Sequence, residues 1–257
     1  MKLVQLHGKP IGDGTHPLIC TPLVGKTRDE ILEELDIVLP KSPDLIEWRV
    51  DFFKDIGNIP LVIELAGRIK EAAGKTPIIF TRRSMNEGGE RIALNEDDVV
   101  KIYVAACASR CVDIIDYELS NPAENIVRLR NVSRDNDVAM IMSYHNFHTT
   151  PNSAALIAKY NDAARLGADI GKVAVMPKSP EDVLTLLGAT WQASERSGIP
   201  VIGMSMGGLG SLSRMIGWVY GSAVTFAVGK SSSAPGQISI EELRVMLSLS
   251  RKTVTGK

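Results

Sequence analysis

Short β-branched segments alternate with longer amphipathic segments along the whole chain, and this alternation limits the folds that the sequence can adopt. Eight short apolar segments are predicted as strands, at 18–21, 45–50, 77–81, 112–117, 138–143, 171–176, 199–204 and 223–228. Each precedes a segment with helical periodicity, at 27–39, 59–73, 95–109, 122–132, 153–166, 179–195, 211–218 and 239–250. Strict alternation predicts a parallel sheet with helical crossovers. Eight such units in about 250 residues are typical of a (β/α)8 TIM barrel.

A doubly wound sheet is the alternative that periodicity alone leaves open. The first strand is not followed by Gly-x-Gly-x-x-Gly, and the sequence contains no P-loop, so the nucleotide-binding signatures of that fold are missing. We therefore expect the barrel, with the first dozen or so residues as a short N-terminal extension. No low-complexity linker or composition break divides the sequence, which favours a single barrel domain over residues 1–257.

The composition is that of a soluble globular protein, with 44% hydrophobic residues, 23% charged residues and a formal net charge of −1. This near-neutral balance gives no support for nucleic-acid binding. No apolar run reaches the roughly 20 residues that span a bilayer, and the N-terminus lacks the features of a signal peptide. Three cysteines, without a metal-ligand spacing, suggest reduced thiols. A cytoplasmic protein without a metal site is expected.

Charged residues alternate with apolar ones in the segment EWRVD at the end of the second predicted strand. Glu47, Arg49 and Asp51 share one face of that strand. The opposite, apolar face suits the surrounding helices, so the three charges are predicted to point into the barrel. Buried ion pairs stabilise weakly, which leaves two interpretations open: an internal ion-pair cluster or a functional site.

Further polar residues follow the third and fifth predicted strands, at the end of the barrel where chemistry takes place. Arg82 and Arg83 point to opposite faces, so only one of them can face the interior, and Glu87 follows in the loop. His145 is expected just past the end of the fifth strand. A histidine at this rim is either structural or an acid/base group, and its position leaves both roles open.

Lys172 lies in the sixth predicted strand, among apolar residues. Period-two alternation places Lys172 on the inward face, together with Ala174. One interpretation is a snorkelling lysine whose stem covers apolar surface. The other is a desolvated lysine, whose pKa falls toward neutrality and whose amine can attack a carbonyl group to form a Schiff base.

The last two strands are followed by glycine-rich and serine-rich segments. GGLGS at 207–211 suits a phosphate held on backbone N–H groups, and Arg214 can bind a carboxylate or a phosphate. SSSAPGQI at 231–238 is expected to close over a ligand. Together the strand ends offer a lysine nucleophile, a histidine acid/base, a glutamate and several arginines. This set suits imine chemistry on an anionic, hydroxylated carbonyl compound.

Six ordered motifs carry a family resemblance that runs nearly end to end: EWRVD, TRRSMNEGGE, SYHNF, GKVAVMP, GMSMGGLGSLSR and SAPGQI. The chain resembles the type I 3-dehydroquinate dehydratases, hydro-lyases that convert 3-dehydroquinate to 3-dehydroshikimate in the shikimate pathway of aromatic amino acid biosynthesis. The resemblance implies a (β/α)8 barrel, commonly a homodimer, that needs neither a metal nor an organic cofactor. Its partner would be a small-molecule substrate, 3-dehydroquinate.

The resemblance also implies a role for each matching residue. Lys172 is similar to the Schiff-base lysine, His145 to the general acid/base, and Glu87 to the glutamate that orients that histidine. The implied substrate-binding residues are Glu47, Arg49, Arg83, Met204, Met206, Arg214, Ser233 and Gln237. The chain departs from the family pattern at Arg82, where an apolar residue is common.

Two other functions are weighed against this resemblance. A lysine-imine aldolase acting on a phosphosugar would explain Lys172 and GGLGS, but it gives no reason for EWRVD or SAPGQ. A non-catalytic barrel that binds a sugar acid would be expected to have lost Lys172 or His145, and both are present.

Overall fold

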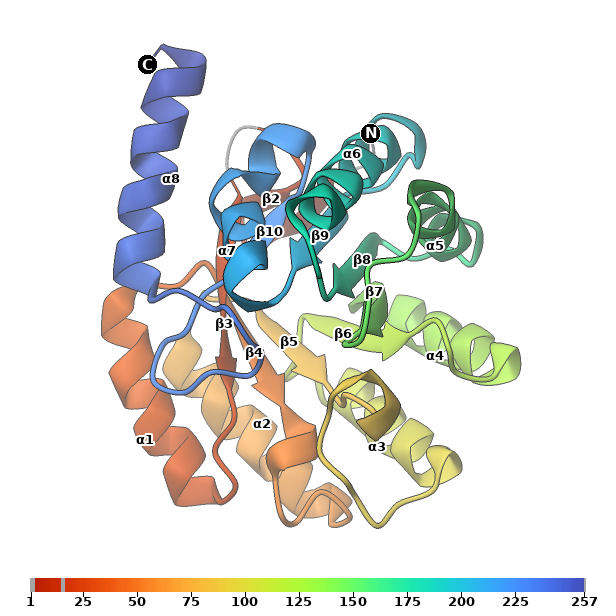
Figure 1. The fold of residues 1–257 in the computed structure, drawn as a ribbon. Coiled ribbons are helices and arrows are strands. Elements are labelled where there is room, and N and C mark those ends of the chain that lie inside the picture. Colours follow the sequence, from red (N-terminus) through yellow and green to blue (C-terminus); the bar gives the residue numbers. More distant parts are fainter. Residues whose placement is uncertain (1–2, 15–16, 257) are drawn as a thin grey trace.

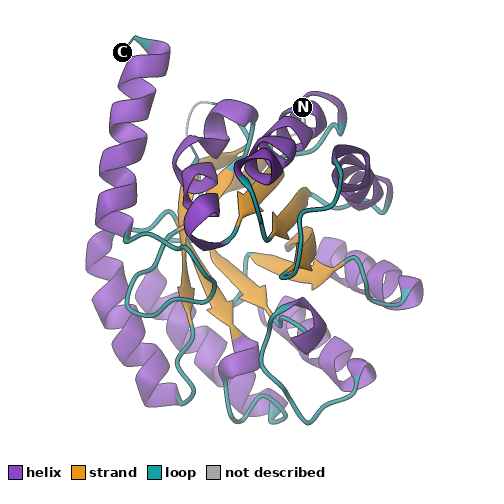
Figure 2. Ribbon diagram, in the orientation of Figure 1, coloured by secondary structure: helices purple, strands orange, loops and turns teal. Residues whose placement is uncertain are grey.

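Eight parallel strands form a nearly closed barrel inside a ring of helices (Figures 1 and 2). The computed structural model describes residues 3–14 and 17–256. The barrel strands are β3 (Leu18–Leu23), β4 (Leu45–Arg49), β5 (Ile78–Thr81), β6 (Ile114–Glu118), β7 (Ala139–Asn146), β8 (Ile170–Val175), β9 (Val201–Ser205) and β10 (Val224–Phe226). The predicted (β/α)8 fold is therefore confirmed.

One α-helix follows each barrel strand. The helices are α1 (Arg28–Val38), α2 (Ile59–Ala73), α3 (Glu96–Ser109), α4 (Ala123–Asp135), α5 (Ser153–Arg165), α6 (Pro180–Arg196), α7 (Gly207–Ile216) and α8 (Ile240–Thr255). Four short 3-10 helices interrupt the loops of the described chain: η1 (Leu39–Lys41), η2 (Val50–Phe52), η3 (Met85–Glu87) and η4 (Gly217–Tyr220). Of these, η2 and η3 shape the site described below.

Hydrogen bonds between the first and last strands bring the sheet close to a full ring. The strand order is β10-β3-β4-β5-β6-β7-β8-β9, and each neighbouring pair is parallel. Ala223, just before β10, donates its N–H to the carbonyl oxygen of Val201 in β9 at 2.8 Å. The carboxyl ends of all eight strands therefore meet at one mouth of the barrel, where side chains from distant parts of the sequence come together.

The N-terminal extension forms a hairpin of β1 (Val4–Leu6) and β2 (Lys9–Ile11), which the sequence patterns did not predict. Val4 and Ile11 are buried in the same apolar cluster as inward-facing residues of the barrel strands. The hairpin thus covers the apolar interior of the barrel. Residues 1–2 of the extension lie outside the described residues.

Two predicted boundaries differ from the structure. His145 lies within β7 rather than past its end, because β7 continues to Asn146 and pairs with β8 up to Val175. The segment GGLGS is not a loop but the first turn of α7, which begins at Gly207 directly after Met206. Gly207 has φ +69°, the left-handed conformation that glycine adopts without strain.

Candidate active site

A cavity at the carboxyl ends of the strands gathers every residue to which the family resemblance assigns a role. It is lined by Glu47, Arg49, Arg83, Glu87, His145, Lys172, Met204, Met206, Arg214, Ser233 and Gln237, together with Gly88, Phe147, Ala174, Phe226 and Ala234. These residues come from strands, 3-10 turns, loops and, for Arg214, helix α7. They are spread over almost the whole chain, and only closure of the barrel brings them together.

Lys172 points from β8 into the barrel and is 4% exposed. Its Nζ lies 2.8 Å from Asp116 Oδ2 and 3.4 Å from Glu47 Oε1. It also lies 4.5 Å from the centre of the Phe226 ring. The snorkelling interpretation is therefore wrong, because the amine does not reach solvent. The lysine is buried, as expected, and its amine lies between two carboxylates.

Asp116, which sequence reasoning missed, is the centre of the charged network. Besides Lys172, it accepts hydrogen bonds from Arg83 Nη2 at 2.9 Å and from Ser143 Oγ at 2.6 Å. Burial opposes ionisation of Asp116, but the charges of Arg83 and Lys172 outweigh it and hold the pKa of Asp116 well below its usual range. Asp116 is therefore a permanent anion beside the amine.

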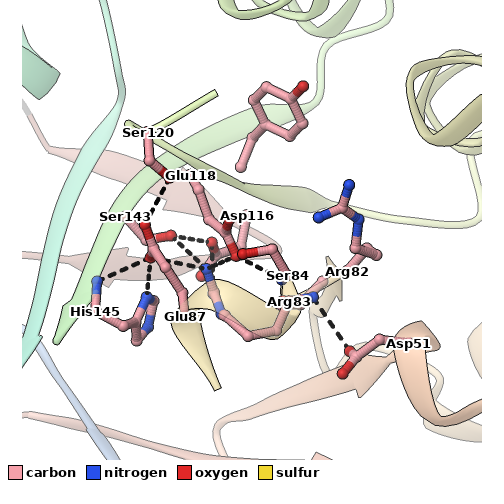
Figure 3. Close-up of polar contacts among 12 residues, drawn as sticks. Asp51, Arg82, Arg83, Ser84, Glu87, Asp116, Glu118, Ser120, Ser143 and His145 are labelled. Atoms are coloured by element: carbon pink, nitrogen blue, oxygen red, sulfur yellow. Dashed lines mark hydrogen bonds and ion pairs between the residues drawn. The ribbon is translucent and has the colours of Figure 1, made fainter. Parts of the chain in front are cut away.

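Arg83 is held by protein carboxylates on the inner side of the barrel (Figure 3). Its Nη1 donates to Glu118 Oε1 at 3.0 Å and to Ser143 Oγ at 2.9 Å. Glu118 also accepts the backbone N–H of Ser84 at 2.7 Å, which fixes the start of the turn that carries Glu87. This network gives Arg83 one orientation in the cavity wall.

His145 and Glu87 form a pair at the mouth. His145 Nδ1 lies 2.9 Å from Glu87 Oε2, and the His145 backbone N–H donates to the same oxygen at 2.8 Å (Figure 3). Ser120 Oγ donates to Glu87 Oε1 at 2.7 Å. Because Glu87 occupies Nδ1, Nε2 is the ring nitrogen left to serve the cavity.

The pKa values of Glu87 and His145 are both shifted in the direction that favours the neutral form of the group. Burial, and then the charge of Glu118, raises the pKa of Glu87 to about 7, while Arg83 opposes that rise. Burial, and then the charges of Arg83 and Lys172, lowers the pKa of His145 well below its usual value. Near neutral pH the imidazole is therefore uncharged and can accept a proton at Nε2.

The three charges of EWRVD do not act alike, which corrects one expectation. β4 ends at Arg49, and η2 turns Asp51 away from the cavity lining. Asp51 binds Arg49 through two hydrogen bonds of 2.8 and 2.7 Å and accepts the backbone N–H of Arg83 at 3.2 Å. Glu47 remains in the cavity and accepts a hydrogen bond from Thr81 Oγ1 at 3.0 Å. Asp51 thus orients the cavity residues from behind.

Arg214 is a buried cation whose charge the described chain leaves unmatched. It is 2% exposed, and its Nη atoms donate to the carbonyl oxygens of Phe226 at 3.1 Å and Pro235 at 3.2 Å. Among the described residues it forms no ion pair, and its Nε has no hydrogen-bond partner. Burial lowers its pKa to about 10, so it stays charged at neutral pH. It can therefore bind an anion in the cavity.

Arg82, the residue outside the family pattern, lies on the helix side of the barrel. Its guanidinium pairs with Glu96 at the start of α3, and Tyr117 Oη donates to the other Glu96 oxygen at 2.7 Å. In Figure 3 the Arg82 side chain points away from the network around Arg83. Arg83 is therefore the inward arginine, as predicted.

The alternation that places Glu47 inside the barrel also predicts inward positions for the site residues that the sequence motifs missed. In β6, with sequence IIDYE, Ile114, Asp116 and Glu118 share one face, and Ser143 occupies the matching position of β7. Neither Asp116 nor Glu118 belongs to any of the six family motifs, so alternation is the local signal that indicates them.

Metal-binding clusters and membrane-spanning helices are both absent from the described residues. No group of three or more His, Cys, Asp or Glu side chains in residues 3–14 and 17–256 is arranged to hold a metal ion. None of the helices found there has the length and apolar character needed to cross a membrane.

The fold and the site together define a class: a (β/α)8 enzyme with a buried lysine between carboxylates, a histidine–glutamate pair and an unmatched arginine around one cavity. The sequence model of "Type I 3-dehydroquinase" matches residues 19–254. A 3-dehydroquinate dehydratase of Albidiferax ferrireducens is 55% identical over 253 residues, 98% of this chain and 96% of that protein. The chain belongs to the type I 3-dehydroquinase family.

Solved structures agree with this assignment. The crystal structure of 3-dehydroquinate dehydratase from Geobacillus kaustophilus has a TM-score of 0.94 at 48% identity, covering 96% of both chains. That of the type I enzyme from Clostridium difficile, with covalently modified comenic acid, has a TM-score of 0.94 at 38% identity, covering 98% of this chain and 99% of that one. The predicted family and the predicted type I 3-dehydroquinate dehydratase, a hydro-lyase, are confirmed, and the two alternative functions are not favoured.

Proposed function

We propose that the chain dehydrates 3-dehydroquinate through an imine on Lys172, with His145 as the proton carrier. The observation that carries this proposal is the placement of Lys172 Nζ between Asp116 and Glu47, in the cavity that the His145–Glu87 pair also lines. An amine that reacts must first lose a proton, and an uncharged imidazole in the same cavity is a suitable acceptor.

The proposed reaction consists of imine formation, elimination of water and hydrolysis of the imine. Lys172 gives a proton to His145 Nε2, and its free amine adds to the C3 carbonyl to form a carbinolamine. His145 returns that proton to the carbinolamine hydroxyl, which leaves as water and gives a cationic imine. His145 Nε2 removes a proton from C2, and the resulting enamine expels the C1 hydroxyl as water after His145 returns the proton to it. Water then hydrolyses the imine of 3-dehydroshikimate and frees the lysine. The net change is the loss of one water molecule from the substrate, by syn elimination.

The fixed carboxylates of Asp116 and Glu47 are placed to stabilise the positive charge of the proposed iminium intermediate. The iminium carries its positive charge where the ammonium of Lys172 had it, 2.8 Å from Asp116 and 3.4 Å from Glu47. Because Asp116 is already ionised and hydrogen-bonded to Arg83, the site needs no reorganisation when the imine forms. The imine is itself the electron sink, so the proposed chemistry requires neither a metal nor an organic cofactor.

The other lining residues hold the substrate in this proposal. Arg214 binds the substrate carboxylate, which supplies the anion that its buried charge lacks. Glu47, Arg49 and Arg83 bind the ring hydroxyls, and Met204 and Met206 pack against the ring. Ser233 and Gln237 approach from the segment before α8. Their hydrogen bond, from the Ser233 backbone N–H to Gln237 Oε1 at 3.0 Å, keeps these two residues together.

We also propose that residues 1–257 act as one catalytic barrel domain, as a homodimer in the cytoplasm, in the shikimate pathway. Support for a dimer comes from large apolar side chains exposed on the adjacent helices α6, α7 and α8: Leu184, Trp191, Leu209, Leu212, Val245 and Leu249. Support for a reducing compartment comes from the free thiols of Cys20, Cys107 and Cys111.

Borohydride trapping tests the mechanism. Reduction in the presence of 3-dehydroquinate should add the mass of the reduced ligand to the peptide that contains Lys172. The nearby Lys178, which is exposed, should carry none. A parallel assay should detect the absorbance of the conjugated product from 3-dehydroquinate. Product without an adduct, or an adduct on another lysine, would refute the proposed role of Lys172, and absence of product would refute the function.

A further inference from the structure

Helix α1 carries a buried carboxyl group that the proposed reaction does not use. Glu34 is 2% exposed and lies on the side of α1 that faces the barrel mouth loops. Its Oε2 accepts the backbone N–H groups of Val24 at 2.7 Å and Gly25 at 2.9 Å. One oxygen of this carboxyl group therefore fixes the loop between β3 and α1.

The second oxygen of the same group has no hydrogen-bond partner among the described residues. A buried carboxylate oxygen without a donor is costly, so such an atom calls for an explanation. Glu34 lines a cleft together with Phe52, Lys230 and Ser231. Burial raises the pKa of Glu34, whereas the N–H groups of Val24 and Gly25, the charge of Lys230 and, least of all, the N–H of Ser231 lower it. The Ser231 N–H therefore acts on the carboxyl group without forming a full hydrogen bond to its second oxygen. The carboxylate would therefore gain from one more full hydrogen bond.

Ser231 begins the segment that brings Ser233 and Gln237 to the cavity. In Figure 1 this blue segment, which precedes α8, crosses in front of β3 and β4. Its base is fixed to α1 and η1: the Gly229 carbonyl oxygen accepts from Lys41 Nζ at 2.7 Å. A Cβ on Gly229 would lie 2.4 Å from Val38 Cγ2, so only glycine allows this close approach. Beyond that base, Lys230 pairs with the exposed Glu33, and Ser231 reaches the cleft that Glu34 lines.

We propose that Glu34 is a positioning residue for substrate closure: its free oxygen accepts the Ser231 N–H when residues 231–237 close over the bound substrate. This inference rests on the proposed function, because closure matters only if Ser233 and Gln237 bind that substrate. Glu34 then joins the loop after β3, which it already holds through Val24 and Gly25, to the segment after β10. The link lies outside the cavity, so it acts on binding rather than on the chemical steps.

The variant Glu34→Gln tests this link. The amide keeps one acceptor oxygen for Val24 and Gly25, but its NH2 group cannot accept the Ser231 N–H. We expect KM for 3-dehydroquinate to rise about tenfold, the effect of losing one charge-assisted hydrogen bond, and kcat to change less than about twofold. The matched control is Glu33→Gln, which removes the exposed ion pair of Glu33 with Lys230, 2.6 Å long, and should change KM less than about twofold.

Hydrogen exchange gives a second readout that a general loss of stability would not reproduce. In the unmodified chain, the borohydride-reduced adduct on Lys172 should slow exchange in residues 229–237, and in Glu34→Gln it should not. Ser231→Pro removes the donor without touching Glu34, so it should raise KM to a similar extent. The double variant should then be no worse than either single variant.

The outcomes separate the two proposals. If no adduct forms in the unmodified chain, the proposed function fails. If the adduct forms while Glu34→Gln leaves KM and exchange unchanged, the proposed function stands and the role of Glu34 is wrong. Additive KM effects in the double variant would equally overturn the link between Glu34 and Ser231.

Discussion

The barrel interior contains two layers that differ in chemistry although they come from the same strands. On β5, β6, β7 and β8 the first layer is Ile79, Ile114, Ile141 and Ile170, which belong to one apolar cluster. The second layer is the next inward residue of each strand, Thr81, Asp116, Ser143 and Lys172. The register is offset by two residues between β6 and β7, so Ile141 pairs with Asp116 there. Both layers are buried. The difference teaches that alternation decides which residues face inward, whereas residue type at one inward position or the next decides whether they form a core or a site.

The two layers also differ in how much they stabilise the fold. Burial of an isoleucine side chain stabilises a fold by about 1.5–3 kcal/mol. Buried ion pairs are weak stabilisers, because desolvation of the charges offsets much of their attraction. Charges such as Asp116, Arg83 and Lys172 therefore add little to stability for their number. The first layer should therefore govern folding, and the second should govern the reaction.

His145→Ala should have the largest effect. Loss of the proton carrier should lower kcat by about 10²–10⁴-fold, while the substrate still binds and the free energy of unfolding changes little. Steady-state kinetics and direct titration with 3-dehydroquinate would measure the two effects. The control is His148→Ala, three residues away on the exposed surface, which should leave kcat within about twofold. Near-normal turnover in His145→Ala would mean that another group moves the proton.

Glu87→Gln should have a smaller effect that depends on pH. The carboxylate form of Glu87 stabilises the imidazolium of His145 through a charge-assisted hydrogen bond, so its loss should lower kcat about 10–100-fold above pH 8. Because burial raises the pKa of Glu87 to about 7, kcat of the unmodified enzyme should rise as pH passes through about 7. The pKa of His145 lies well below that of an ordinary imidazole and cannot supply this limb.

The contribution of Glu87 to the stability of the fold should fall as pH rises, whereas its contribution to kcat rises. The folded chain keeps a proton on Glu87 up to about pH 7, whereas the unfolded chain releases it near the ordinary pKa of 4.5. The contribution of Glu87 to the free energy of unfolding is therefore greatest below pH 4.5 and declines as pH rises to about 7. Glu87→Gln should abolish both trends. A kcat limb near pH 7 that survives in the variant would assign it to another group.

Much of this molecule could be predicted from the sequence, because the repeated strand–helix units indicate the fold and the motifs indicate the site residues. Eight repeated units were enough to indicate the barrel, and the motifs identified Lys172, His145 and Glu87. Alternation on β6 also indicates Asp116 and Glu118 as inward residues. The long-range pairing of Lys172 with Asp116, 56 residues apart, is a product of barrel closure. No local pattern contains it.

Other features depend on packing that local patterns do not report. The β1–β2 hairpin is too short to show periodicity, and burial of Val4 and Ile11 against the barrel is what gives it a place. GGLGS suggests a loop by composition, yet Gly210 is required inside α7: a Cβ there would lie 2.3 Å from the Ser205 backbone. Tertiary contact with β9 thus overrides the low helix propensity of glycine.

The sharpest test of the two layers uses one strand and removes one heavy atom at a time. Ile141→Val deletes a methyl group from the first layer of β7, where Ile141 is 1% exposed among other inward residues. It should lower the free energy of unfolding by about 1 kcal/mol and leave kcat/KM within about twofold. Urea unfolding and steady-state kinetics measure both quantities.

Ser143→Ala deletes an oxygen two residues further along β7, in the second layer. Ser143 Oγ accepts from Arg83 at 2.9 Å and donates to Asp116 at 2.6 Å, so its loss loosens the anion beside Lys172. We expect kcat/KM to fall about fivefold, which corresponds to about 1 kcal/mol for a net hydrogen bond. The division is supported if Ile141→Val lowers the free energy of unfolding without lowering kcat/KM, and if Ser143→Ala lowers kcat/KM. If Ile141→Val lowers kcat/KM as much as Ser143→Ala does, the first layer positions the site as well, and the two layers act as one unit.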